Sequence, residues 1–113
     1  MTKSLSHFLC WMLALLAILV PYVARAERRV ALVIGNSNYQ FAEKLVNPDN
    51  DAKAMAGLLQ TLGFDVVKGE NLTKQEMIST IQKFSELASG VDTALLFYAG
   101  HGIQLEGKNY FIP

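Results

Sequence analysis

Three short apolar runs alternate with two segments of helical periodicity between residues 28 and 99. The first run, residues 28–35, is continuous in β-branched and other apolar residues and ends in glycine, which is typical of a strand buried on both faces. Residues 64–67 and 93–99 form the second and third runs. The order strand, helix, strand, helix, strand is that of a parallel sheet with right-handed crossovers. We therefore expect an α/β fold: a three-layer sandwich with a mostly parallel sheet flanked by helices.

The first helical segment is expected to begin at Asn50 or Asp51, either of which suits an amino-terminal cap, and to run to about Leu62. Gly63 follows, and glycine commonly ends helices by adopting a left-handed conformation. Apolar side chains recur at four-residue spacing, with two more beside them, and give the helix an apolar face: Ala54, Leu58 and Leu62, then Met55 and Leu59.

The second helical segment is expected from about Lys74 to Ala88, closed by Gly90. Thr73 and Glu76 have the spacing of a capping box at its start. Five apolar side chains are expected to face the core: Met77, Ile78, Ile81, Phe84 and Leu87.

The last residues predict a small hairpin. Residues 103–105 and 110–112 are expected to pair around the polar segment 106–109. Leu95 to Tyr98, in the strand before it, are expected to belong to the core. No closing helix follows the hairpin, so we expect the fold to be incomplete at the carboxyl end.

Residues 8–24 carry no charge, follow a cationic start and precede Ala24-Arg25-Ala26. These are the three parts of a secretory signal peptide. The alternative is an uncleaved membrane anchor, but spanning a bilayer takes about 20 apolar residues, and Pro21 interrupts this stretch. We expect residues 1–26 to be a cleaved signal peptide that exports residues 27–113 to the periplasm or the extracellular space.

Cleavage there would limit the chemistry available to the chain. It removes Lys3 and Arg25 from ten basic residues, which leaves eight against ten acidic residues and a net charge of about −2. No basic patch remains to indicate nucleic-acid binding or an anionic membrane surface. Cys10 and His7 are also lost, so the mature segment keeps no thiol and one histidine, His101. We therefore expect no disulfide, no Cys/His zinc site and no cofactor.

His101 is the best candidate for a catalytic residue. Gly100 and Gly102 flank it directly after a buried strand, at the edge where parallel sheets carry their reactive groups. The alternative is a surface-turn histidine whose glycines only turn the chain, and the local pattern leaves both open. No Ser-His-Asp arrangement is apparent. The loop at residues 35–38 lacks the glycine spacing of a phosphate-binding loop.

Several segments of the chain, in order, resemble the caspase and metacaspase clan. Arg-Val-Ala-Leu-Val-Ile-Gly-Asn-Ser-Asn-Tyr at 29–39 looks like its opening strand and loop, and Leu-Val-Asn-Pro-Asp-Asn-Asp-Ala at 45–52 is similar to the start of its first helix. Residues 62–66 and 71–73 resemble its next strand and helix start. Phe-Tyr-Ala-Gly-His-Gly-Ile at 97–103 is similar to the segment with the clan's catalytic histidine. The match is closer to bacterial members than to animal caspases.

The resemblance implies a caspase-like fold and a cysteine endopeptidase acting on peptides or proteins. In that mechanism His101 would accept the thiol proton and later protonate the leaving amine, and the backbone N–H of Gly102 would help to stabilise the oxyanion. In caspases the cysteine follows the histidine by about 50 residues, which places it beyond Pro113. The 113-residue chain alone is therefore expected to be inactive. Likeness to metacaspases also allows calcium, which no residue of this segment indicates.

Asp51 has two interpretations. Metacaspases cleave after Arg or Lys and line the specificity pocket with aspartates near this helix start, so the resemblance implies that Asp51 binds substrate. The alternative is that Asp51 caps the helix, where a carboxylate contributes about 0.5–2 kcal/mol. The two roles are compatible.

Two other hypotheses remain. A caspase-like pseudoenzyme or interaction domain would keep the fold without hydrolysis, and a residue other than cysteine about 50 positions after His101 would identify it. A flavodoxin-like binding domain fits the strand pattern but gives His101 no role. The sequence does not indicate the oligomeric state.

Overall fold

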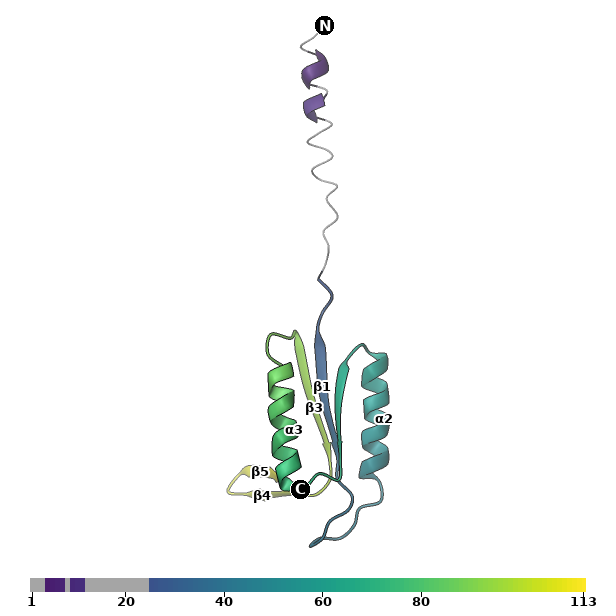
Figure 1. Ribbon diagram of the computed structural model, residues 1–113, viewed down its shortest axis with the longest axis vertical. Coiled ribbons are helices and arrows are strands. Elements are labelled where there is room, and N and C mark those ends of the chain that lie inside the picture. The colour runs from purple at the N-terminus through teal and green to yellow at the C-terminus, as the bar shows by residue number, and fades with distance from the viewer. Residues whose placement is uncertain (1–3, 8, 12–24) are drawn as a thin grey trace.

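The central strand of the sheet is β1, Arg29–Gly35, as Figure 1 shows. It is also the most buried of the three strands. It pairs in parallel with β2, Asp65–Glu70, on one side and with β3, Thr93–Ala99, on the other, so the strand order is β2-β1-β3. Residues 30–35 are all buried. A central parallel strand is covered on both faces, which explains its unbroken apolar run and confirms the predicted parallel sheet.

The computed structural model describes residues 4–7, 9–11 and 25–113. The predicted signal peptide lies mostly outside the described residues, so the cleavage stays a prediction. Within the described part of the chain, no helix is long and apolar enough to cross a bilayer.

Two helices cover opposite faces of the sheet (Figure 1). Ala31 and Val33 of β1 face α2, Pro48–Thr61, whereas Leu32 and Ile34 lie on the other face, with α3, Lys74–Leu87. The alternation follows from the two-residue period of a strand. The result is the predicted three-layer arrangement of helix, sheet and helix.

The start of α2 differs from the prediction. The helix begins at Pro48 after the cap position Asn47, and the backbone N–H of Asp51 donates to the Asn47 carbonyl at 2.9 Å. The expectation that Asn50 or Asp51 caps this helix is therefore wrong. Proline suits the first helical position because it lacks an N–H and its φ is already helical. Asp49 and Asp51 lie in the first turn, where negative charge complements the helix dipole.

The buried face of α2 also differs from the predicted one. Ala52, Ala56 and Leu59 are buried, whereas Leu58 and Leu62 are more than half exposed. The reason is a close approach at the end of β1. A Cβ added to Gly35 would lie 2.7 Å from the Cβ of Ala52 and 2.7 Å from the carbonyl oxygen of Pro48. Alanines face the sheet because this spacing leaves no room for larger side chains.

The capping box of α3 is confirmed. The Thr73 hydroxyl accepts from the backbone N–H of Glu76 at 3.3 Å, and the Glu76 carboxylate accepts from the backbone N–H of Thr73 at 2.8 Å. The hydrogen bonds from Thr73 hold the pKa of Glu76 below its usual value.

The apolar face of α3 is only partly buried. Met77 is buried and Phe84 packs against the core, as expected. Ile78, Ile81 and Leu87 are 37–42% exposed, so the expectation that they lie in the core is wrong. Ile78 and Ile81 instead line an open groove of about 420 Å³ together with side chains of the hairpin.

The predicted hairpin forms, from β4, Gly102–Leu105, and β5, Lys108–Phe111. Its bounds differ from the prediction, because residues 108 and 109 belong to β5 rather than to the turn, and Ile112 follows the strand. Glu106 and Gly107 make its two-residue turn with φ of 49° and 76°, as primed hairpin turns require. Leu96 of β3 is 44% exposed, so the expectation that it belongs to the core is wrong. Among the described residues, β3 has a strand neighbour on one side only.

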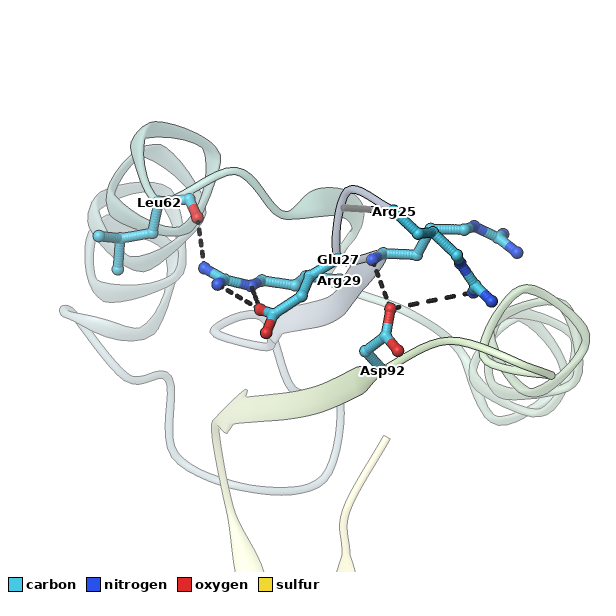
Figure 2. Close-up of polar contacts among 6 residues, drawn as sticks. Arg25, Glu27, Arg29, Leu62 and Asp92 are labelled. Carbon is cyan, nitrogen blue, oxygen red and sulfur yellow. Dashed lines mark hydrogen bonds and ion pairs between the residues drawn. The ribbon is translucent and has the colours of Figure 1, made fainter. Parts of the chain in front are cut away.

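Exposed polar contacts hold the amino ends of the strands, as Figure 2 shows. Arg29 pairs with the Glu27 carboxylate and donates to the Leu62 carbonyl at 3.2 Å, which links β1 to the end of α2. The Asp92 carboxylate, just before β3, accepts from the backbone N–H of Arg28 at 2.8 Å and lies 4.0 Å from the Arg25 guanidinium.

Candidate functional site

The candidate site lies at the carboxyl edge of the sheet. His101 follows β3 with one residue, Gly100, between them. The long loop after β1 reaches the same edge before α2 begins (Figure 1). Because the strands are parallel, all three end at this edge, and side chains from distant parts of the sequence meet there. His101 is half-buried.

The side chains of buried Asn36 and exposed Asn71 fix the start of the loop after β1. The backbone N–H groups of Ser37 and Asn38 both donate to the side-chain oxygen of Asn71, at 2.8 and 3.0 Å. The side-chain oxygen of Asn36 accepts from the backbone N–H of Leu72 at 3.0 Å. Asn36 is 2% exposed. These bonds satisfy polar groups that would be costly to bury unpaired, and they direct the chain toward His101.

The His101 imidazole has a defined orientation. Its Nε2 lies 2.7 Å from the carbonyl oxygen of Glu43. A carbonyl oxygen only accepts hydrogen bonds, so Nε2 must carry a proton, and in the neutral ring Nδ1 is then the proton-accepting nitrogen. The ring of Tyr39 packs on the imidazole at a centroid distance of 4.5 Å and a tilt of 58°.

The backbone of His101 is held on both sides. Its N–H donates to the hydroxyl of Tyr39 at 2.7 Å, and its carbonyl accepts from the hydroxyl of Tyr98 at 2.8 Å and from the backbone N–H of Ile112 at 3.0 Å. Burial, followed by the contact with Tyr39, raises the pKa of Tyr98 well above its usual value, so its hydroxyl stays protonated.

Gly100 is needed for space rather than for an unusual backbone conformation, because its φ is not positive. A Cβ on Gly100 would lie 2.5 Å from the hydroxyl oxygens of both Tyr39 and Tyr98. Gly102 opens β4, is exposed and pairs with Phe111. It follows His101 directly, and its oxyanion role stays a prediction.

Asp51 lies at the same edge of the sheet as His101, in the first turn of α2, and is exposed. Within residues 4–7, 9–11 and 25–113 its carboxylate has no hydrogen bond or ion pair. Among the described residues, no hydrogen bond or ion pair joins Asp51 to His101, and the role of Asp51 in binding substrate stays a prediction.

Sequence reasoning missed Tyr39, Tyr98 and Glu43. Tyr98 was assigned to the core as part of an apolar run, and Tyr39 was treated as a loop residue. The alternation of β3 places Tyr98 on the α3 face, and its hydroxyl reaches the sheet edge. A tyrosine two residues before Gly100 was the available signal, whereas the contact with the backbone oxygen of Glu43 leaves no trace in the sequence.

Tyr39 and Ile112, which both contact His101, also line an open pocket of about 540 Å³. Its other walls come from the loop after β1, the start of α3 and the end of the chain. In the described part of the chain, no three His, Cys, Asp or Glu side chains are grouped to hold a metal ion. The site described so far is one oriented imidazole beside an open pocket.

Comparison with known proteins identifies the family. Residues 28–113 match the caspase domain. The chain is 39% identical over 88 residues to human mucosa-associated lymphoid tissue lymphoma translocation protein 1, and 36% identical over 78 residues to rat caspase-1. It is 28% identical over 80 residues to a Caenorhabditis elegans protein described as putative inactive caspase B.

These alignments cover 78%, 67% and 71% of this chain but only 11%, 19% and 30% of the human, rat and worm proteins. The chain therefore corresponds to a small part of each relative's length. The matched residues include the three strands of the parallel sheet, the two helices that cover it and the segment that carries His101. This chain belongs to the caspase-domain family.

Proposed function

We propose that this chain supplies the histidine-bearing part of a cysteine endopeptidase, with His101 as the general base. The observation that carries the proposal is the imidazole orientation: Nε2 lies 2.7 Å from the Glu43 carbonyl, which leaves Nδ1 as the proton acceptor. Membership of the caspase-domain family supports the reaction class. The nucleophilic cysteine comes from a later part of the full-length protein, about 50 residues after His101.

In the proposed reaction Nδ1 of His101 takes the proton of the cysteine thiol, and the thiolate attacks the scissile carbonyl carbon. The imidazolium carries a proton on each nitrogen, and the Glu43 carbonyl stabilises the positive charge through Nε2–H. Nδ1–H then gives its proton to the leaving amine as the C–N bond breaks, which leaves an acyl-enzyme. Nδ1 next accepts a proton from water, which hydrolyses the thioester and restores the thiol. The N–H of Gly102 donates to the oxyanion in both halves.

The proposed specificity is for Arg or Lys before the scissile bond. Asp51 supports it: the carboxylate is exposed at the edge of the sheet that carries His101 and has no partner among the described residues. A well-formed pair between a carboxylate and a guanidinium contributes on the order of a few kcal/mol. A panel of fluorogenic peptides ending in Arg, Lys or Asp tests this on the full-length protein, with Asp51→Asn beside the wild type. If Asp51→Asn kept the same preference for Arg and Lys over Asp as the wild type, Asp51 would not be part of the pocket.

The second candidate is a catalytically inactive caspase-like domain, favoured by the similarity to putative inactive caspase B. His101→Ala in the full-length protein separates the two. For an endopeptidase we expect kcat to fall by about 10²–10⁴-fold, with unfolding temperature unchanged. Wild-type protein that cleaves no peptide would favour the inactive domain.

We also propose that residues 1–26 are removed as a signal peptide. Ala26 and Glu27 are exposed and precede β1, so cleavage between them leaves the sheet intact. Mass spectrometry of the exported protein should give Glu27 as the first residue, whereas an intact Met1 in the membrane fraction would favour an anchor.

A further inference from the structure

We propose that Tyr39 and Tyr98 are positioning residues for His101 and form a chain of two hydroxyl groups that ties the amide N–H of His101 to its own carbonyl. The catalytic consequence rests on the proposed function. The hydrogen-bond chain itself does not, because it is defined by contacts within the described residues and can be measured without activity.

The direction of every proton in this chain follows from the end groups. The His101 N–H can only donate, and it lies 2.7 Å from the Tyr39 hydroxyl. The carbonyl oxygens of His101 and Ile112 can only accept, and each lies 2.8 Å from the Tyr98 hydroxyl. The single hydroxyl proton of Tyr98 is therefore shared between the two carbonyls, so Tyr39 donates to Tyr98 across 3.3 Å. Only one order of donors is compatible with these end groups, and it begins and ends on His101.

Gly100 shows how tightly the chain is built. An added Cβ would lie 2.5 Å from both tyrosine hydroxyls and 2.8 Å from the Cζ of Tyr98. The φ of Gly100 is not positive, so a turn does not explain the glycine. Because Gly100 has no side chain, the hydroxyls of Tyr39 and Tyr98 can approach each other next to the backbone of His101.

The chain also holds the hairpin in place. The Ile112 N–H donates to the His101 carbonyl at 3.0 Å, and the Ile112 carbonyl accepts from Tyr98. Phe111 stacks on the Tyr98 ring at a centroid distance of 4.4 Å. Three segments far apart in the sequence, the loop after β1, the end of β3 and the end of β5, are therefore joined at one pair of hydroxyls.

These contacts position the imidazole because they fix the peptide groups on both sides of the His101 Cα. The direction of the Cα–Cβ bond is then set, and the Tyr39 ring restricts the side chain from one face. What remains is the orientation with Nε2 at the Glu43 carbonyl. Small displacements of a catalytic group reduce rates strongly, so loss of either hydroxyl should slow turnover through His101.

The first test measures the hydrogen bond at the His101 amide. The full-length protein is labelled with ¹⁵N-histidine, His101 is assigned with His101→Gln, and amide exchange is followed by NMR. Tyr39→Phe keeps the ring and removes the hydroxyl, so we expect exchange at His101 to be about tenfold faster. Tyr110→Phe is the matched control, because Tyr110 lies in β5 and has no hydrogen bond from its hydroxyl within the described residues. Equal exchange in wild type and Tyr39→Phe would overturn the proposal.

The second test measures turnover in the same variants. Tyr39→Phe and Tyr98→Phe should each lower kcat about tenfold with KM changed less than about twofold, and should move the limb of the pH–rate profile that reports His101. Tyr110→Phe should match the wild type. An active wild type with unchanged kcat and pH profile in both variants would overturn the positioning role. A wild type without activity would refute the proposed function, and the exchange rates would still decide the hydrogen-bond chain.

Discussion

At the amino ends of the strands the contacts are made largely by exposed charges, whereas at the carboxyl ends they are made by neutral and half-buried groups. The Arg29–Glu27 pair joins side chains that are 39% and 63% exposed. The Arg25–Asp92 pair, which the proposed cleavage after Ala26 would remove, joins side chains that are 71% and 45% exposed. At the other end, Asn36 is 2% exposed, and hydrogen bonds to and from hydroxyl and backbone groups enclose His101.

The physical consequence is a difference in rigidity. Exposed ion pairs are screened by salt and contribute about 0–1 kcal/mol each, so they tolerate change. Half-buried neutral hydrogen bonds are costly to leave unmade, so they select one geometry. The end with the fixed geometry is the end where His101 lies, as an oriented general base requires.

The largest effect of a single substitution is expected at Gly35, on the carboxyl end. Gly35→Ala places a Cβ 2.7 Å from Ala52 and from the Pro48 carbonyl, so α2 must shift away from β1. We expect a loss of about 1–3 kcal/mol in the free energy of unfolding, measured with urea on the full-length protein.

Gly57→Ala is the matched control, because no atom lies within 4 Å of an added Cβ there and the residue is inside α2. It should stabilise by about 0.5–1 kcal/mol. Similar unfolding free energies for both variants would mean that the chain is packed no more closely around Gly35 than around Gly57 on the surface of α2.

The next effect is alkaline loss of stability through Tyr98, whose pKa is raised by burial. A raised pKa means that the folded state holds the proton more firmly than the unfolded state. The contribution of Tyr98 is therefore complete below the unfolded value of about 10 and falls as the pH rises above it. Tyr98→Phe should flatten the decline in unfolding temperature between pH 9 and 11 relative to Tyr110→Phe. Parallel declines would show that Tyr98 does not titrate differently on folding.

The capping box of α3, also on the carboxyl end, is expected to contribute less. Thr73→Ala removes the hydroxyl that accepts from Glu76 N–H, with a loss of about 1 kcal/mol. Because the pKa of Glu76 is lowered in the fold, its contribution is complete above the unfolded value of about 4.3 and is lost as the pH falls through the folded value. Urea unfolding at pH 7 and pH 3 should therefore show a smaller difference between wild type and Thr73→Ala at pH 3. An equal difference at both pH values would show that the contribution of Thr73 does not depend on the charge of Glu76.

The smallest effect is expected at the amino end. Glu27→Gln removes the exposed pair with Arg29 and should change the free energy of unfolding by less than about 0.5 kcal/mol, with the difference vanishing in 1 M salt. A loss above about 1 kcal/mol that persists in salt would break the proposed contrast between the two ends.

The sequence predicted the sheet because apolar runs report burial directly. Val30 to Ile34 form an unbroken run that only a doubly covered strand explains, and Thr73 with Glu76 gave the start of α3 from local chemistry. The glycines that flank His101 after a buried strand made it the candidate, and the family resemblance gave it a catalytic role. Each of these signals lies within a few neighbouring residues.

What could not be predicted depends on how segments approach one another. The buried face of α2 carries Ala52 and Ala56 rather than Leu58 because Gly35 draws the helix close, and hydropathy ranks leucine as the better core residue. Tyr39 and Tyr98 meet across 59 residues of sequence, and their contact depends on the absence of a side chain at Gly100. Such contacts become visible only when the strand order is known.

The central claim, that the carboxyl end of the sheet holds His101 with Nδ1 as the proton acceptor, is tested most directly by the tautomer of its imidazole. Long-range ¹H–¹⁵N correlation spectra of the ¹⁵N-histidine-labelled full-length protein, recorded under conditions where the ring is neutral, distinguish the two ring nitrogens. Because Nε2 lies 2.7 Å from the Glu43 carbonyl, we predict a single neutral form protonated at Nε2. A His101 protonated at Nδ1, or an exchanging mixture of the two forms, would contradict the account.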